Sequence, residues 1–288
     1  GLFSRKIMTE DNVSEAVRKL GWKIAPTFWD GEGAKPLLDR YGAGAGDNTF
    51  LKQFTYDEQS GMVKGSFPLG NARLDAIVRS KGIRVATLDD LYKPEVRAMF
   101  DGRFYSDPAA LALRGNENKG YSKNNPLIAQ LVELVEDANG RVEFPLLVTG
   151  WDVEPIEGDD KGYGLKVVKR DDFLAVHDKR LNGENNGKRF NKLKDNLPDF
   201  EDSGEYTFYA SDNATLARLC VDSDGDLNTN YAVLGNTDDD GRVVFLPAEG
   251  AAEILKGRFK DLERARAEQH RLVEEWYGDS VGSAPVKG

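Results

Sequence analysis

Oxygen-bearing side chains recur at short intervals in the stretch 216–246, LARLCVDSDGDLNTNYAVLGNTDDDGRVVFL. They are Asp222, Asp224, Asp226, Asn228, Asn230, Tyr231, Asn236, Asp238 and Asp240. Alternating acids occur in calcium loops, which need glycine at the sixth position and an acid at the twelfth. A loop that begins at Asp222 has Leu227 sixth and Val233 twelfth, and two further registers also lack the twelfth acid. The spacing therefore predicts no metal site and no cofactor, although calcium binding in another geometry stays open.

Groups suited to nucleophilic catalysis are sparse in this chain. Cys220 is the single cysteine and stands in an apolar run, so we interpret it as a buried small hydrophobic residue. His177 and His270 are the only histidines, and they do not form a pair at metal-ligand spacing. We therefore expect that the chain is not an enzyme. A hydrolase with dispersed carboxylates stays an alternative, because its two acids need no shared local motif.

The residue types between 219 and 241 are restricted. Lysine and glutamate are absent there, although surface loops use both freely. Changing only the adenines of an asparagine codon, AAC or AAT, gives codons for Asp, Ser, Gly, Thr, Tyr, Ala, Val, Leu and Cys. The same changes never give Lys, Glu, Gln, Trp or Met. The composition therefore predicts a template rich in asparagine codons whose adenines were randomised.

The run LARLCVDSDGDLNTNYAVLGNTDDDGRVV resembles the variable region of proteins diversified by diversity-generating retroelements. In those systems an error-prone reverse transcriptase miscopies template adenines, and the product replaces part of a target gene. The resemblance implies a C-type-lectin-like fold that displays the nine side chains named above as a ligand-binding face. It covers about 200–246 well and 141–199 loosely, and it does not reach 1–120. One departure is that a segment with a strong helical pattern follows the variable region.

Alternation along strands and the irregular loops would point the nine side chains outward, while the intervening Leu and Val residues and Arg242 hold the fold. Acids dominate this copy, and Tyr231 is the only aromatic residue among the nine. We therefore expect an acidic face suited to a basic or polar patch on a protein or cell-surface ligand. A structural or virion-associated protein with acidic surface loops stays an alternative.

The expected fold class is α+β, in four segments. Residues 1–115 read as a mixed N-terminal region, and a C-type-lectin-like domain with irregular antiparallel strands is expected at 120–248. The polar run 114–126 is either the boundary between them or a long surface loop within one domain. An amphipathic helix at 250–278 and a flexible tail at 279–288 follow. The N-terminal region is expected to contain a hairpin at 50–69, helices at 72–80 and 89–100, and a strand at 83–88. The later domain is expected to contain a helix at 127–138, a polar loop at 181–200, and strands at 142–149, 163–169, 205–210, 215–221, 231–234 and 242–246.

Bulk properties narrow the class of protein. The 288 residues are 40% hydrophobic, which is enough for a folded core. The formal net charge of −10 argues against nucleic-acid binding, because phosphate contacts need clustered Lys and Arg. No apolar run is long enough for a membrane span and no signal-peptide pattern is present, so localisation stays open. The helix at 250–278 packs on its own chain or pairs with another copy, which makes an oligomer possible.

Overall fold

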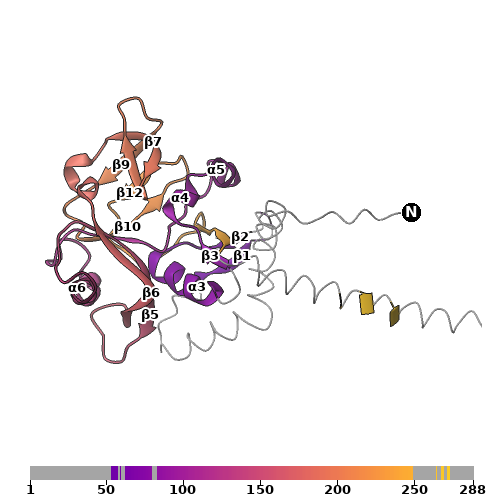
Figure 1. Cartoon of the computed structure of the whole chain (residues 1–288), viewed down its shortest axis with the longest axis horizontal. Helices are drawn as coiled ribbons and strands as arrows, with labels where there is room; N and C mark the ends of the chain where they lie inside the picture. Colours follow the sequence, from indigo (N-terminus) through magenta and orange to yellow (C-terminus); the bar gives the residue numbers. More distant parts are fainter. Residues whose placement is uncertain are drawn as a thin grey trace, which may run out of the picture.

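The computed structural model describes residues 53–57, 59, 62–79 and 83–248, and the helical positions 264, 267, 268, 271 and 272 (Figure 1). Most of the helix expected at 250–278, the tail at 279–288 and the first part of the N-terminal region lie outside the described residues. Within the description the chain is α+β, because helices pack on several sheets whose strands are mostly antiparallel.

A four-stranded antiparallel sheet, in the order β10-β4-β5-β6, forms the centre of the fold. Its strands are β4 (Leu111–Leu113), β5 (Leu146–Pro155), β6 (Leu165–His177) and β10 (Leu216–Arg218). Leu111 and Leu113 belong to the hydrophobic core that contains helices α3 (Pro68–Arg79) and α6 (Asn125–Asn139). Ala112, between them, belongs to a second core. Because successive residues of a strand face opposite sides, β4 is buried on both faces of the sheet, whereas the edge strand β6 exposes Leu174 and Val176.

The second core separates the central sheet from a five-stranded sheet, in the order β11-β12-β9-β7-β8. The strands are β7 (Arg189–Lys194), β8 (Leu197–Phe200), β9 (Tyr206–Ala210), β11 (Cys220–Val221) and β12 (Leu227–Thr229). Figure 1 shows three of these strands, β7, β9 and β12, at the end of the molecule away from α3 and α6. The strand β12 pairs with β9 in parallel, and the other pairs are antiparallel. Phe190, Phe208 and Leu227 are fully buried between the two sheets, and helices α4 (Leu88–Leu91) and α5 (Pro94–Phe100) add to this core.

Two small sheets join the earlier part of the chain to its later part. They contain β1 (Thr55–Asp57), β2 (Met62–Lys64) and β13 (Arg242–Val243), and β3 (Ile83–Val85) with β14 (Phe245–Pro247). Three short 3-10 helices are Ser122–Asn124, Lys179–Leu181 and Gly183–Asn185. The expected division between 1–115 and 120–248 does not coincide with a break in the sheets, because β4 lies between β5 and β10. Residues on both sides of that division share both cores.

Several expected elements are present. The expected hairpin is formed by β1 and β2, in which Tyr56 lies opposite Val63. The apolar spacing predicts that Leu127, Leu131, Leu134 and Val135 of helix α6 face inward, and all but the half-buried Leu134 are buried. The expected helix at 89–100 is divided into α4 and α5, because Pro94 cannot donate the backbone hydrogen bond of a continuing helix.

Two expectations about the later domain are wrong. The expected polar loop at 181–200 contains β7 and β8, joined through Asp195 and Asn196 at φ 51° and 61°, the positive angles of a two-residue hairpin turn. The segment 231–234, expected to be a strand, is not one, and the strand nearest to it is β12, which ends at Thr229. Side chains satisfy the backbone of 231–234, because Asn124 Nδ2 donates to the Ala232 carbonyl at 2.7 Å and the Leu234 amide donates to Tyr163 Oη at 3.1 Å.

Candidate ligand-binding site

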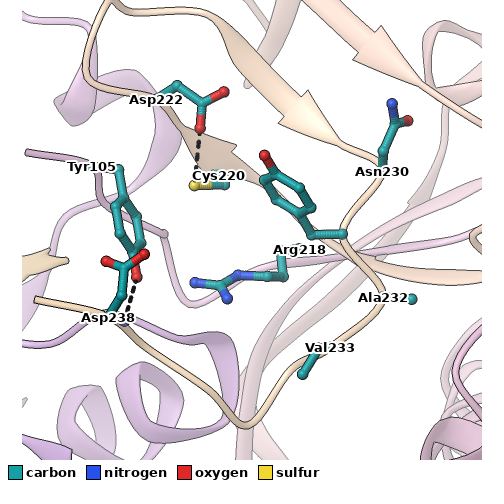
Figure 2. Close-up of a pocket in the computed structure, with 9 residues that line it drawn as sticks. Tyr105, Arg218, Cys220, Asp222, Asn230, Ala232, Val233 and Asp238 are labelled. Atoms are coloured by element: carbon teal, nitrogen blue, oxygen red, sulfur yellow. Dashed lines mark hydrogen bonds between the residues drawn. The ribbon is translucent and has the colours of Figure 1, made fainter. Parts of the chain in front are cut away.

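A cavity of ≈ 470 Å³ opens where the segment after β10 passes the segment after β12 (Figure 2). Its volume lies in the usual range for ligand pockets. It is lined by Tyr105, Arg218, Cys220, Asp222, Asn230, Tyr231, Ala232, Val233 and Asp238. All of these residues except Tyr105 come from 218–238, within the stretch 216–246 that contains the nine predicted binding residues.

A buried ion pair fixes the arginine of this pocket. Arg218 is 7% exposed and Asp107 is fully buried. Arg218 Nε donates to Asp107 Oδ1 at 2.9 Å, and Nη2 donates to Oδ2 at 2.6 Å. Nη2 also donates to the Ser66 carbonyl and Nη1 to the Asn236 carbonyl, at 2.8 and 3.0 Å. Burial alone would lower the pKa of Arg218, but the Asp107 carboxylate raises it above its usual value, so the guanidinium stays charged.

Asp222 begins the turn after β11 and carries a perturbed carboxyl group. Burial raises the pKa of Asp222 to about 6, and the neighbouring carboxylates of Asp224 and Asp226 act in the same direction. The Sγ of Cys220 donates to Asp222 Oδ1 at 3.5 Å, a contact drawn in Figure 2. Burial also raises the pKa of the Cys220 thiol well above its usual value, which makes this group a poor nucleophile.

The turn 222–226 is held rigidly from both sides. The Asp222 amide donates to the Asp226 carbonyl at 2.8 Å, and Arg97 Nη2 donates to the Ser223 carbonyl at 3.1 Å. Tyr92 Oη donates to the carbonyl of Gly225 at 2.8 Å. A residue other than glycine at 225, where φ is +97°, would place its Cβ 2.4 Å from the Tyr206 ring. The acid at 222 therefore projects from a fixed backbone.

The opposite wall of the pocket depends on Tyr105. Its hydroxyl lies 3.0 Å from Thr237 Oγ1 and accepts from the Asp238 amide at 3.2 Å. Its backbone amide donates to the Asp240 carbonyl at 3.1 Å, and the Asp240 amide donates to Asp238 Oδ1 at the same distance. In Figure 2 Tyr105 and Asp238 stand together, across the pocket from Asn230. A residue outside the variable-looking run thus orders the loop 236–240.

The structure brings four of the nine predicted binding residues to the pocket: Asp222, Asn230, Tyr231 and Asp238. The other five do not line it: Asp224, Asp226, Asn228, Asn236 and Asp240. All nine are exposed or half-buried, whereas Val221, Leu227 and Leu234 between them are fully buried. Asp226 has a structural role, because its Oδ1 accepts from the Thr207 amide at 2.6 Å.

Sequence reasoning missed five lining residues. Cys220, Ala232 and Val233 could have been found, because all three residue types arise from an asparagine codon by adenine changes. Only polar residues were selected from the run. Tyr105 lies outside the run, and no local pattern marks Arg218, since the places of both in the pocket depend on contacts between segments that are distant in sequence.

The pocket shows no arrangement for a resident metal. Among the described residues, no group of three or more His, Cys, Asp or Glu side chains could hold a metal ion. None of the helices in the described part of the chain has both the length and the apolar character that a membrane crossing requires. No family model matches the chain, and no curated protein or solved structure matches it.

Proposed function

We propose that the chain is a ligand-binding display protein whose binding face, about 220–240, is diversified by adenine-directed mutagenesis from a retroelement. One observation carries this proposal. Eight of the nine residues that line the pocket come from 218–238. Seven of those eight are either Asn230 itself or residues of the types named above as products of adenine changes in an asparagine codon. Residue types that such changes produce therefore supply most of the pocket lining, although five of the nine predicted binding residues lie outside it.

The arrangement suits a protein that must tolerate many side chains at one face. The turn 222–226 is held by Arg97, Tyr92 and backbone hydrogen bonds, and these contacts do not depend on the side chain at 222. Asp224 adds one further bond, because its Oδ1 accepts from the Asp226 amide at 3.1 Å. Val221 and Leu227 anchor the same segment in the second core. Side chains can change on such a scaffold while the backbone is retained, as in antibody paratopes. A C-type-lectin-like scaffold is the fold that we propose for this display, in keeping with the α+β architecture.

The proposed ligand is a protein or a cell-surface molecule rather than a nucleic acid. The exposed side chains of the face include Asp224, Asp238 and Asp240, and like charges disfavour a phosphate backbone. Tyr231 is 49% exposed and offers an aromatic contact beside the pocket. Aromatic residues that enter a partner's pocket contribute most to interface affinity.

The coding DNA tests this proposal. We expect a near-identical repeat of the segment that encodes about 218–241, close to the gene and to a reverse transcriptase gene, with differences confined to template adenines. If no such repeat exists, or if its differences fall equally on all four bases, the retroelement proposal is wrong. The chain would then fit the alternative of a structural or virion-associated protein with acidic loops.

A hydrolase is the second candidate, because Asp222, with its pKa raised to about 6, shares the pocket with a second carboxylate, Asp238. A carboxyl group with a raised pKa suits general acid catalysis, and a second carboxylate suits base or nucleophile chemistry. Release of nitrophenol from aryl glycosides by the wild-type protein, lost in Asp222→Asn and Asp238→Asn, would support this candidate. Equal background release by wild type and both variants would reject it for this substrate class.

A further inference from the structure

We propose that the pocket binds one cationic side chain, the ammonium of a lysine or the guanidinium of an arginine, from the protein ligand. This inference rests on the proposed function, because it identifies the chemistry that the same face would recognise. It is specific to the pocket and does not follow from the net charge of the chain, since charge far from the pocket is screened in salt.

The charge of the lining favours a cation. Arg218 is the only positively charged residue that lines the pocket, and Asp107 lies behind it outside the lining. This pair is neutral as a unit, so the carboxylates of Asp222 and Asp238 remain as the uncompensated charges of the lining. A half-buried pocket of this kind strengthens attraction to an opposite charge relative to open solvent.

The hydrogen bonding of Arg218 disfavours an anion. A guanidinium has five N–H donors, and four hydrogen bonds from Arg218 already go to Asp107, the Ser66 carbonyl and the Asn236 carbonyl. The paired donors that would hold a carboxylate or phosphate in a bidentate manner are thus committed inside the protein. One remaining N–H can donate to a neutral carbonyl or hydroxyl oxygen of the ligand.

The remaining lining fits the stem of a long basic side chain. Ala232 and Val233 provide apolar surface, and lysine and arginine cover such surface with their methylene groups while the charged end reaches polar partners. Tyr105 already lies near a cation, because its ring centroid is 5.8 Å from Arg218 Cζ. Tyr231, which is half-exposed, can offer its ring face to a second cation.

The test is a titration of the full, isotopically labelled chain, monitored by amide NMR shifts. The probes are N-acetyl-lysine methylamide, its uncharged analogue N-acetyl-norleucine methylamide, and N-acetyl-glutamate methylamide, each at millimolar concentration. We expect saturable shifts at 222, 230–233 and 238 with the lysine probe only. Asp222→Asn and Asp238→Asn should each weaken its binding by roughly tenfold, since each removes one facing charge.

The matched control is Asp239→Asn. Asp239 is next to Asp238, but its side chain is 92% exposed, pairs with Lys64 at 2.9 Å and does not line the pocket. Its variant should bind the lysine probe within about twofold of wild type, because this solvent-screened charge lies outside the pocket lining. Asp238 is also exposed, so its variant keeps the test valid if Asp222→Asn perturbs the fold.

Three results would overturn the inference. They are equal shifts with the norleucine probe, preferential shifts with the glutamate probe, and no saturable shift at the pocket with any probe. These results leave the proposed function intact if the coding DNA contains the adenine-biased repeat. Conversely, lysine binding without such a repeat would keep the pocket assignment and reject the retroelement.

Discussion

Removing one partner of the buried ion pair between Asp107 and Arg218 should lower the free energy of unfolding by an amount that can be stated in advance. The Asp107 carboxylate is fully buried and accepts from Arg218 at 2.9 and 2.6 Å and from Ser66 Oγ at 2.7 Å. Asp107→Asn keeps the shape, removes the negative charge and turns an amide donor toward the guanidinium. Breaking one side of a buried pair leaves an uncompensated buried charge and costs about 3–5 kcal/mol. Because domains are stable by only about 5–15 kcal/mol, this loss is a large fraction of the total.

Denaturant unfolding followed by tryptophan fluorescence measures this change, since Trp151 is fully buried in the first core. We expect Asp107→Asn and Arg218→Met each to lower the free energy of unfolding by about 3 kcal/mol or more. The double variant Asp107→Asn with Arg218→Met should lose at least about 2 kcal/mol less than the sum of the single losses, because no charge is left unpaired.

The exposed pair between Lys64 and Asp239 provides the control. Asp239→Asn should cost less than about 1 kcal/mol, as exposed pairs do. The reasoning is refuted if Asp107→Asn costs no more than this control, or if the losses of the single variants add fully in the double variant. Either result would mean that Arg218 is not held by a buried charge.

Three further predictions concern single positions. Gly150→Ala should destabilise the protein by at least about 2 kcal/mol in thermal unfolding, because φ is +71° and the new Cβ would lie 2.2 Å from the Asp172 carbonyl oxygen. The control Gly187→Ala, at φ +81° with no atom within 4 Å of the new Cβ, should destabilise it clearly less. Burial raises the pKa of Asp222 from 3.8 to about 6, so the folded state binds this proton more tightly than the unfolded state does. The stability of the wild type relative to Asp222→Asn should therefore fall as pH rises from about 4 to about 6. A flat difference between the two proteins in urea unfolding at these pH values would contradict this. The buried Cys220 thiol, with its pKa raised by burial, should react with iodoacetamide only after denaturation, and reaction in the native protein at the rate of a free thiol would show that it is accessible.

Local patterns predicted the elements that depend on local chemistry. The apolar spacing from Leu127 to Val135 identified the buried face of α6, because one face of a helix repeats every three to four residues. The hairpin of β1 and β2 was predicted from the turn residues Gln59, Ser60 and Gly61 within 50–69. In both cases the residues that decide the structure are neighbours in sequence.

Elements that depend on distant contacts were not predictable in this way. The strand β7 carries Lys192 and Lys194 on a largely exposed surface, so its composition is typical of a loop, and only pairing with β8 and β9 makes it a strand. The segment 231–234 has the apolar content of a strand, but the side chains of Asn124 and Tyr163 satisfy its backbone instead. Propensity gave the wrong answer in both cases because tertiary contacts decided the outcome.

The candidate site likewise has one feature that local sequence predicted and one that depends on distant contacts. The exposure of the nine polar residues follows from their polar types in short strands and turns, which is a local property. The pocket itself requires Tyr105 and the Asp107–Arg218 pair, and these come together through pairing of β4 with β10 and of Ser106 with Val221. No spacing in the sequence contains that information.

The most direct test of the diversified binding face is to sequence this gene in several isolates and map the substitutions. The account predicts that they concentrate at exposed and pocket-lining positions, including 220, 222, 230–233 and 238, and that they coincide with template adenines. It also predicts that the buried residues Val221, Leu227 and Leu234 stay constant, because they hold the scaffold. Substitutions spread evenly over the described chain, or as frequent at these buried positions as in the pocket, would contradict a display protein diversified at this face.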